Sequence, residues 1–194
     1  MKVTGFVVAG GRSQRMGRDK ALLPWGGTDL LGHALARLSA VAGDVRILSG
    51  SEPRYLDRGV PVLTDPVPDA GPLAGVLAGL ATADDQPGLF LAVDLPLVPV
   101  TLLSRLLALG GGCDAVVPVS PRGPEPLCAL YGPACLEPIR RRVARGDLKM
   151  TCFWPDVHVR EMPPEELRVF GDVEELFRNL NTPADLTVDR PRRA

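Results

Sequence analysis

Short apolar runs alternate with longer segments in which apolar residues recur every three or four positions. Short runs bounded by glycine, proline or aspartate predict buried strands, and the longer spacing predicts amphipathic helices. The predicted strands span 4–8, 45–48, 60–63, 89–93, 115–119, 127–131 and 157–161. The predicted helices span 29–42, 72–83, 101–109 and 133–145, a loop covers 121–126, and short helices and loops extend through 173–177. This alternation predicts an α/β protein with a mainly parallel central sheet.

The chain has 194 residues, which is enough for one α/β domain with a full core and short for two. Apolar residues make up 45% and charged residues 23%, which excludes wholesale disorder. The sequence contains no internal repeat, linker or low-complexity segment. We therefore expect a single domain over residues 1–189, followed by a disordered tail at 190–194.

The formal net charge is −1, so the protein has no overall positive field to attract nucleic acid or anionic lipid. No apolar run approaches the ~20 residues of a membrane span, and no secretory signal is evident. Widely spaced cysteines without a CxxC pair are typical of free thiols in a reducing compartment; they are Cys113, Cys128, Cys135 and Cys152. We expect a cytoplasmic protein with no nucleic-acid or membrane partner.

A glycine-rich, cationic segment follows the first predicted strand, which ends at Val8. Ligands of open α/β sheets bind outside the carboxyl ends of the strands, so this segment lies where a ligand is expected. Gly10 and Gly11 allow backbone N–H groups to approach phosphate oxygens closely. Nearby side chains add four positive charges that suit a triphosphate; they are Arg12, Arg15, Arg18 and Lys20.

Lys20 stands out because the chain has nineteen arginines but only three lysines. A lysine inside the glycine-rich segment indicates a need for a compact ammonium group. The segment does not match a P-loop, since Gly17 is followed by arginine and Lys20 by alanine. The Gly-x-Gly-x-x-Gly spacing is also absent. A kinase-like NTPase and a nicotinamide-dependent dehydrogenase are therefore disfavoured.

Asp94 closes the predicted strand 89–93 in the run Leu-Ala-Val-Asp-Leu-Pro. A carboxylate at this end of a strand faces the same crevice as the glycine-rich segment. Magnesium is usually held by one or two carboxylates together with substrate phosphates. Asp94 is therefore the predicted metal ligand. Earlier in the chain, Gly71 and Gly75 within Gly-Pro-Leu-Ala-Gly open the predicted helix 72–83 and allow helix N–H groups to approach a ligand closely.

The pattern Ala-Gly-Gly-x-x-x-Arg-Met-Gly-x-Asp-Lys over residues 9–20 resembles the signature of the molybdenum cofactor guanylyltransferase family, within the nucleotidyltransferase superfamily. Two glycines after Ala9 resemble the guanylyl branch, whereas cytidylyl relatives usually have two alanines before one glycine. Segments 126–131 and 177–186 also resemble the family, so the similarity spans nearly the whole chain. It implies a three-layer α/β/α nucleotidyltransferase fold with a mainly parallel, mixed sheet and a Rossmann-like N-terminal half.

The resemblance implies catalytic roles for Lys20, Arg15 and Asp94. It also implies a set of nucleotide-binding residues, which are Val8, Ala9, Gly10, Gly11, Arg12, Lys20, Ser49, Asp65, Gly71, Gly75 and Asp94. Asp65 could meet the guanine edge or the ribose, because a carboxylate can accept from guanine N1–H and its amino group; Asp69 is a competitor. Ser49 stands where the family commonly has asparagine, and its hydroxyl makes fewer hydrogen bonds than a carboxamide.

For the acceptor, the resemblance points to Asn179 and Asn181 as residues that hold the pterin. Capping of a helix that starts near Pro183 is an equally supported reading.

The reaction implied is transfer of GMP from Mg-GTP to the terminal phosphate of molybdopterin, with release of pyrophosphate and Mg2+ as the cofactor. A phosphate monoester is already a nucleophile near neutral pH, so the scarcity of histidine is no obstacle. Transient contact with molybdoenzymes or cofactor-delivery proteins would follow. The alternatives are transfer of CMP to the same cofactor, nucleotidyl transfer to a sugar or alcohol phosphate, and a noncatalytic nucleotide-binding module. Lys20 and Asp94 together argue against the last.

Overall fold

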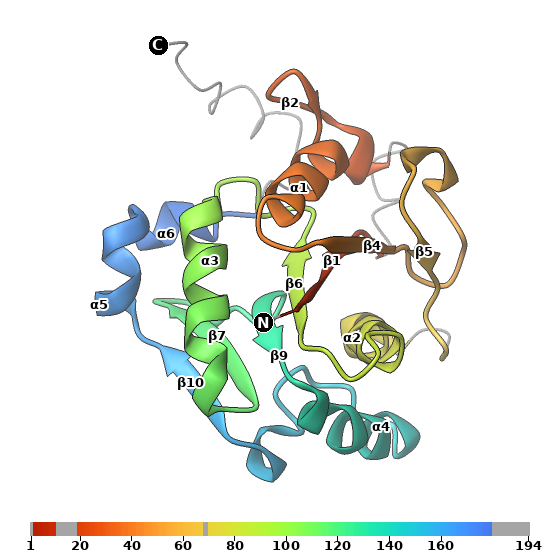
Figure 1. The fold of residues 1–194 in the computed structure, drawn as a ribbon, viewed down its shortest axis with the longest axis vertical. Coiled ribbons are helices and arrows are strands. Elements are labelled where there is room, and N and C mark those ends of the chain that lie inside the picture. Colours follow the sequence, from red (N-terminus) through yellow and green to blue (C-terminus); the bar gives the residue numbers. More distant parts are fainter. Residues whose placement is uncertain (1, 11–18, 68–69, 180–194) are drawn as a thin grey trace.

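The structure is a computed structural model that describes residues 2–10, 19–67 and 70–179 (Figure 1). The predicted site residues Gly11, Arg12, Arg15 and Asn181, and the competitor Asp69, lie outside these ranges. The long helices are α1 (Leu30–Ser39), α2 (Gly71–Ala81), α3 (Val100–Leu109) and α4 (Leu136–Ala144), and the short ones are α5 (Pro164–Leu167) and α6 (Val173–Leu176). The main sheet contains β1 (Thr4–Val8), β4 (Asp44–Leu48), β5 (Val62–Leu63), β6 (Gly88–Ala92), β7 (Ala115–Ser120), β8 (Gly123–Pro124), β9 (Cys128–Tyr131) and β10 (Val159–Met162).

The strand order in the sheet is β10-β7-β9-β6-β1-β4-β5, with β8 paired to β7. The half formed by β5, β4, β1 and β6 is entirely parallel. In the other half, β9 runs antiparallel to both β6 and β7, so β6 and β7 point in the same direction. The carboxyl ends of β1, β4, β5, β6 and β7 therefore share one edge of the sheet, and β9 begins at that edge. We call it the carboxyl edge.

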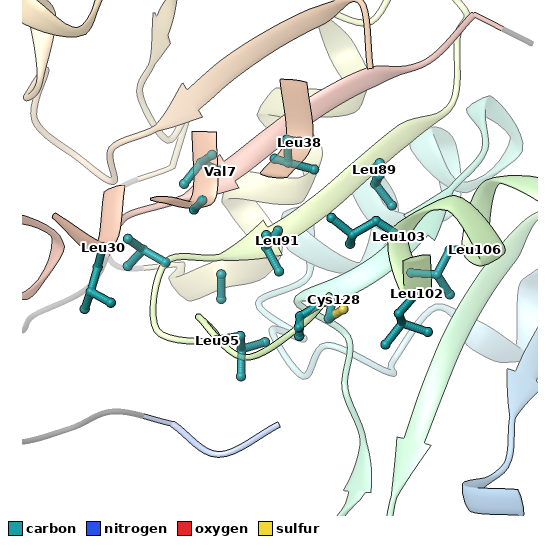
Figure 2. Close-up of a cluster of buried hydrophobic side chains, with 14 of the residues drawn as sticks. Val7, Leu30, Leu38, Leu89, Leu91, Leu95, Leu102, Leu103, Leu106 and Cys128 are labelled. Atoms are coloured by element: carbon teal, nitrogen blue, oxygen red, sulfur yellow. The ribbon is translucent and has the colours of Figure 1, made fainter. Parts of the chain in front are cut away.

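The first face of the sheet is covered by α1 and α3. Alternate strand residues point to opposite faces, so Val7 of β1 packs on this side while its two neighbours do not. Figure 2 shows some of the buried hydrophobic side chains that fill the space between sheet and helices. Those labelled are Val7, Leu30, Leu38, Leu89, Leu91, Leu95, Leu102, Leu103, Leu106 and Cys128.

The second face is covered by α2 and α4 and contains most of the buried aromatic rings. Phe6 and Phe90 from adjacent strands stack with ring centroids 4.8 Å apart. Tyr131 meets Phe90 edge-on at 5.6 Å and Phe153 at 5.8 Å. Glycines make room for these rings: a Cβ at Gly79 of α2 would lie 2.9 Å from the Phe90 ring. The two covered faces establish the three-layer α/β/α arrangement.

Most of the predicted elements are confirmed within one to three residues, including 4–8 as β1 and the late edge strand as β10. Three details differ. The predicted strand 60–63 is ladder-paired only at Val62–Leu63, and the predicted loop 121–126 contains β8. The hairpin of β2 (Pro24–Trp25) and β3 (Thr28–Asp29) was not predicted, because strands of two residues have no detectable periodicity. Within the described ranges, no helix is long and apolar enough to span a membrane.

Substituting Gly79 by alanine should destabilise the protein even though alanine favours helix formation. The added methyl group would lie within 3.0 Å of two Phe90 ring atoms, with Phe6 beside them at 3.3 Å. Overpacking of this kind costs about 1–3 kcal/mol, to be measured by urea unfolding. Gly43→Ala is the matched control, because a Cβ there meets nothing within 4 Å, and its unfolding midpoint should stay near that of the wild type. Equal stability of the Gly79→Ala variant and the wild type would contradict this packing account.

Candidate active site

The residues that follow four adjacent strands lie together at the carboxyl edge. Ala9 follows β1, Ser49 follows β4, Asp65 lies just beyond β5 and Asp94 just beyond β6. Backbone hydrogen bonds continue past the strand ends: Ala9 N donates to Leu48 O at 2.9 Å, and Asp65 N donates to Gly50 O at 2.8 Å. These bonds hold the starts of the loops in register with the sheet, so the positions of the loop residues follow from the strand order.

Lys20 and Asp94 are joined directly. Lys20 begins a 3-10 turn (Lys20–Leu22) that is capped by the carboxylate of Asp19, which accepts from Ala21 N at 3.0 Å. From this turn Lys20 Nζ reaches Asp94 Oδ2 at 3.0 Å, and the side chains are only 13% and 29% exposed. Two of the predicted catalytic residues, 74 positions apart in sequence, therefore share one partly buried ion pair.

Gly10 is required where the loops after β1 and β4 cross. A Cβ at this position would lie 2.7 Å from Gly50 N and 2.8 Å from Gly50 Cα. Any side chain would force the two loops apart, so one function of this glycine is close packing of backbone against backbone. Val8 is buried at the end of β1, and its carbonyl accepts from Val93 N at 3.0 Å.

Asp65 lies over the start of α2. Its Oδ1 is 3.4 Å from the position that a Cβ at Gly75 would take, so the small residue at position 75 leaves room for the carboxylate. Burial raises the pKa of Asp65. Within residues 2–10, 19–67 and 70–179, no side chain or backbone N–H donates a hydrogen bond to its carboxylate, and burial alone accounts for the shift. Gly71 opens α2 with a φ of +66°, a conformation that glycine adopts without strain.

Ser49 is buried, with 1% of its surface exposed. Its hydroxyl lies 2.7 Å from Glu52 O, to which it donates, and 3.3 Å from Leu63 O. The single proton of the hydroxyl therefore stabilises the turn after β4 in this conformation. The contact with a nucleotide base stays a prediction.

The loop after Asp94 is anchored to α1. Arg37 donates to the carbonyl of Val98 and, at 2.7 Å, to Nε2 of His33. The same His33 nitrogen lies 3.0 Å from Pro96 O, and burial is the main cause of the lowered pKa of this imidazole. These contacts connect α1 to the loop that begins at Asp94.

Glu125 lies near Asp94, in the turn that leads into β9. β6 and β9 pair Leu91 with Cys128, and Ala92 N donates to Leu127 O at 2.7 Å beyond the last ladder pair. Beyond this bond both chains turn: Leu95 N donates to Ala92 O at 3.2 Å and Cys128 N donates to Glu125 O at 3.0 Å, so Asp94 and Glu125 lie in the two turns that follow the paired residues. Burial raises the pKa of Glu125, and the charge of Asp94 adds to the effect. The sequence analysis missed this residue, because its proximity to Asp94 depends on β9 being antiparallel.

The segment that bears Asn179 lies on the same side of Asp94 as Glu125. Arg122, in the turn between β7 and β8, donates to the carbonyl of Phe177. Asn179 is exposed two residues further along. The end of α6 therefore lies beside the β7–β8 hairpin that precedes Glu125. Strands β6, β1 and β4 separate this side of the sheet from β5 and Asp65. A role for Asn179 in acceptor binding stays a prediction.

Comparison with known proteins gives a consistent result. Residues 5–154 match the MobA-like NTP transferase domain. The chain is 34% identical over 190 residues to a protein of Pelotomaculum thermopropionicum named "Probable molybdenum cofactor guanylyltransferase", covering 98% of this chain and 93% of that one. It is 32% identical to the molybdenum cofactor guanylyltransferase of Serratia proteamaculans, covering 95% and 92%. The crystal structure of molybdopterin-guanine dinucleotide biosynthesis protein A from Archaeoglobus fulgidus superposes with a TM-score of 0.79 at 26% identity, covering 95% of each chain.

Asp65→Asn should stabilise the unliganded protein at neutral pH. Because the folded-state pKa of Asp65 is raised, the unfolded carboxyl loses its proton first, and stability falls as pH rises from the ordinary value of 3.8 through the folded pKa. The neutral amide removes this penalty. The resulting gain in the free energy of unfolding should be less than about 1 kcal/mol, because the carboxylate is still partly solvated. Urea unfolding of the variant and the wild type at several pH values measures this gain. The gain should vanish below pH 3.8, and a variant less stable than wild type at pH 7 would contradict the assignment.

Proposed function

The chain belongs to the MobA-like NTP transferase family and is a nucleotidyltransferase, and from that premise we propose that it transfers GMP from Mg-GTP to the terminal phosphate of molybdopterin. The observation that carries the proposal is the Lys20–Asp94 ion pair at the middle of the carboxyl edge. It stands between a side that suits a nucleotide and a side that suits an acceptor. Full-length relatives named as guanylyltransferases support the same reaction.

On the nucleotide side, the close crossing of Gly10 and Gly50 leaves backbone without side chains at the end of β1. Asp65 offers a half-buried carboxylate that is suited to the N1–H and amino donors of guanine or to ribose hydroxyls. Lys20 supplies a positive charge within reach of the phosphates, which would lie between the Gly10–Gly50 crossing and Asp65. Gly71 and Gly75 keep the start of α2 open towards this space.

The donor set also fits magnesium. Asp94 offers a partly exposed carboxylate at the carboxyl edge. Within the described ranges, no three His, Cys, Asp or Glu side chains lie close enough together to hold a metal by themselves. A site of this kind, with one carboxylate completed by nucleotide phosphates and water, is how magnesium is commonly bound. When bound, the ion would neutralise negative charge on the phosphates.

The chemistry requires positioning more than proton transfer. An oxygen of the acceptor phosphate forms a bond to the α-phosphorus of GTP, and the bond from that phosphorus to the β-phosphate bridging oxygen breaks, which releases pyrophosphate. The attacking group is already anionic near neutral pH, so no side chain has to remove a proton. Lys20 stabilises the charge that develops on the phosphate oxygens, and the fixed strand ends hold the two substrates in line.

On the acceptor side, the hairpin of β7 and β8 and the segment ending at Asn179 border the space beyond Asp94. We place the pterin on this side, where Asn179 and Asn181 are the candidates to hold it. Arg15 and the other cations of residues 11–18 complete the phosphate site in this proposal.

The choice of nucleotide is tested by measuring thermal stabilisation with GTP, CTP, UTP and ATP, each with Mg2+, and then turnover with molybdopterin. We expect GTP to stabilise most and to be the only efficient substrate, with one pyrophosphate released per dinucleotide formed. Preferential turnover of CTP would replace the guanylyl assignment with a cytidylyl one. Stabilisation by a nucleotide without turnover would indicate a binding module.

Lys20→Ala and Asp94→Ala should each lower kcat/KM for Mg-dependent pyrophosphate release by about 10²–10³-fold, since each removes a charge aimed at the reacting phosphates. Lys149→Ala and Asp57→Ala are matched controls at exposed positions, and their kinetics should equal those of the wild type. Retained turnover in both site variants would refute the roles assigned to the ion pair.

A further inference from the structure

Arg54 connects three segments that frame the nucleotide side of the site. Its Nη1 donates to Asp19 Oδ2 at 3.2 Å, and its Nη2 donates to Ala9 O at 3.3 Å and to Ser49 O at 3.0 Å. Ala9 precedes Gly10 at the start of the glycine-rich segment, and Asp19 lies next to Lys20 at its other end. One guanidinium therefore spans the two ends of that segment and ties both to the end of β4.

Tyr55 reinforces the same contact. Its hydroxyl donates to Asp19 Oδ2 at 2.7 Å, and the Arg54 guanidinium lies over its ring, 5.2 Å from the centroid. Burial, followed by the hydrogen bond to Asp19, raises the pKa of the phenol, so the hydroxyl keeps its proton and remains a donor.

The backbone at Tyr55 is left-handed, with a φ of 65° and a ψ of 30°. For a bulky residue this conformation is uncommon and strained, and it persists only where surrounding contacts enforce it. The contacts that enforce it here are the bonds to Asp19 on one side and the buried ring on the other. The strain therefore serves to point the hydroxyl at Asp19.

We propose that Arg54 and Tyr55 are positioning residues that fix Asp19, and through it Lys20, at the distance from Ala9 and Gly10 that a nucleotide triphosphate requires. Asp19 transmits the effect because its carboxylate caps the turn from which Lys20 reaches Asp94. The Arg54 side chain is 32% exposed and that of Asp19 25%, so the contact is shielded from solvent well enough to hold its geometry. Arg54 and Tyr55 act on the affinity for the triphosphate, because they set the separation of the protein groups that contact it before it binds.

This inference rests on the proposed function for the identity of the ligand. It is tested by titrating the whole chain, in the presence of Mg2+, with GTP and in parallel with inorganic tripolyphosphate, which has no base. Arg54→Ala should weaken binding of both about tenfold, which corresponds to the loss of one strong charge-assisted hydrogen bond. Tyr55→Phe should weaken both about threefold, because the Arg54 bonds remain. Arg54→Lys should fall between Arg54→Ala and wild type, since an ammonium cannot reach three acceptors at once.

Arg58→Ala is the matched control. Arg58 lies in the same loop and makes a two-point ion pair with Asp29, the residue that caps α1, at 2.6 and 3.2 Å. It should lose comparable thermal stability but keep wild-type affinity for both ligands. In turnover, Arg54→Ala should raise the KM for GTP about tenfold while the KM for molybdopterin stays unchanged, which a general loss of structure would not produce.

The outcomes separate the two proposals. If Arg54→Ala binds tripolyphosphate as tightly as Arg58→Ala does, the positioning role is overturned whatever nucleotide is the substrate. If wild type binds tripolyphosphate with the predicted losses in the variants but does not bind GTP, the positioning role stands and the guanylyl assignment fails. If wild type binds neither ligand, both proposals fail.

Discussion

The ion pair between Lys20 and Asp94 spans the centre of the carboxyl edge, and the rest of the site is arranged around it. A lysine and an aspartate at 3.0 Å neutralise each other, so neither charge is left unpaired in a partly buried place. In the proposed reaction, a triphosphate with its metal would offer a new partner to each: phosphate oxygens to the ammonium, and a cation to the carboxylate. The pair thus keeps together the two charges that the proposed reaction would use.

The direction of β9 determines what lies on either side of that pair. Because β9 is antiparallel to β6 and β7, it starts at the carboxyl edge, and the turn that leads into it brings Glu125 near Asp94. The parallel half places Ala9 and Asp65 on the opposite side. A purely parallel sheet would place a long crossover connection where the hairpin now stands. The mixed sheet therefore gives one edge two chemically different halves, as a reaction that joins a nucleotide to an acceptor requires.

The long elements could be predicted because their periodicity is strong: 4–8 and 101–109 match β1 and α3 within a residue. The positions of Gly10, Asp65 and Asp94 at one edge followed from the parallel strands that precede them. Two features could not be predicted. The proximity of Glu125 to Asp94 depends on strand direction, which short apolar runs do not encode. Arg54 and Tyr55 hydrogen-bond to Asp19, 35 and 36 residues away, and the contact depends on the left-handed backbone at Tyr55. No local sequence pattern predicts such a contact.

The most direct test of the account is a crystal structure of the protein with GTP and Mg2+. The account predicts that Lys20 Nζ leaves Asp94 Oδ2 for a phosphate oxygen, that Asp94 contacts the metal, and that Asp65 meets the guanine or the ribose. The guanine would then lie on the β5 side of the edge and the open face of the α-phosphorus would point towards Glu125. A nucleotide bound elsewhere, with the 3.0 Å ion pair intact, would contradict it.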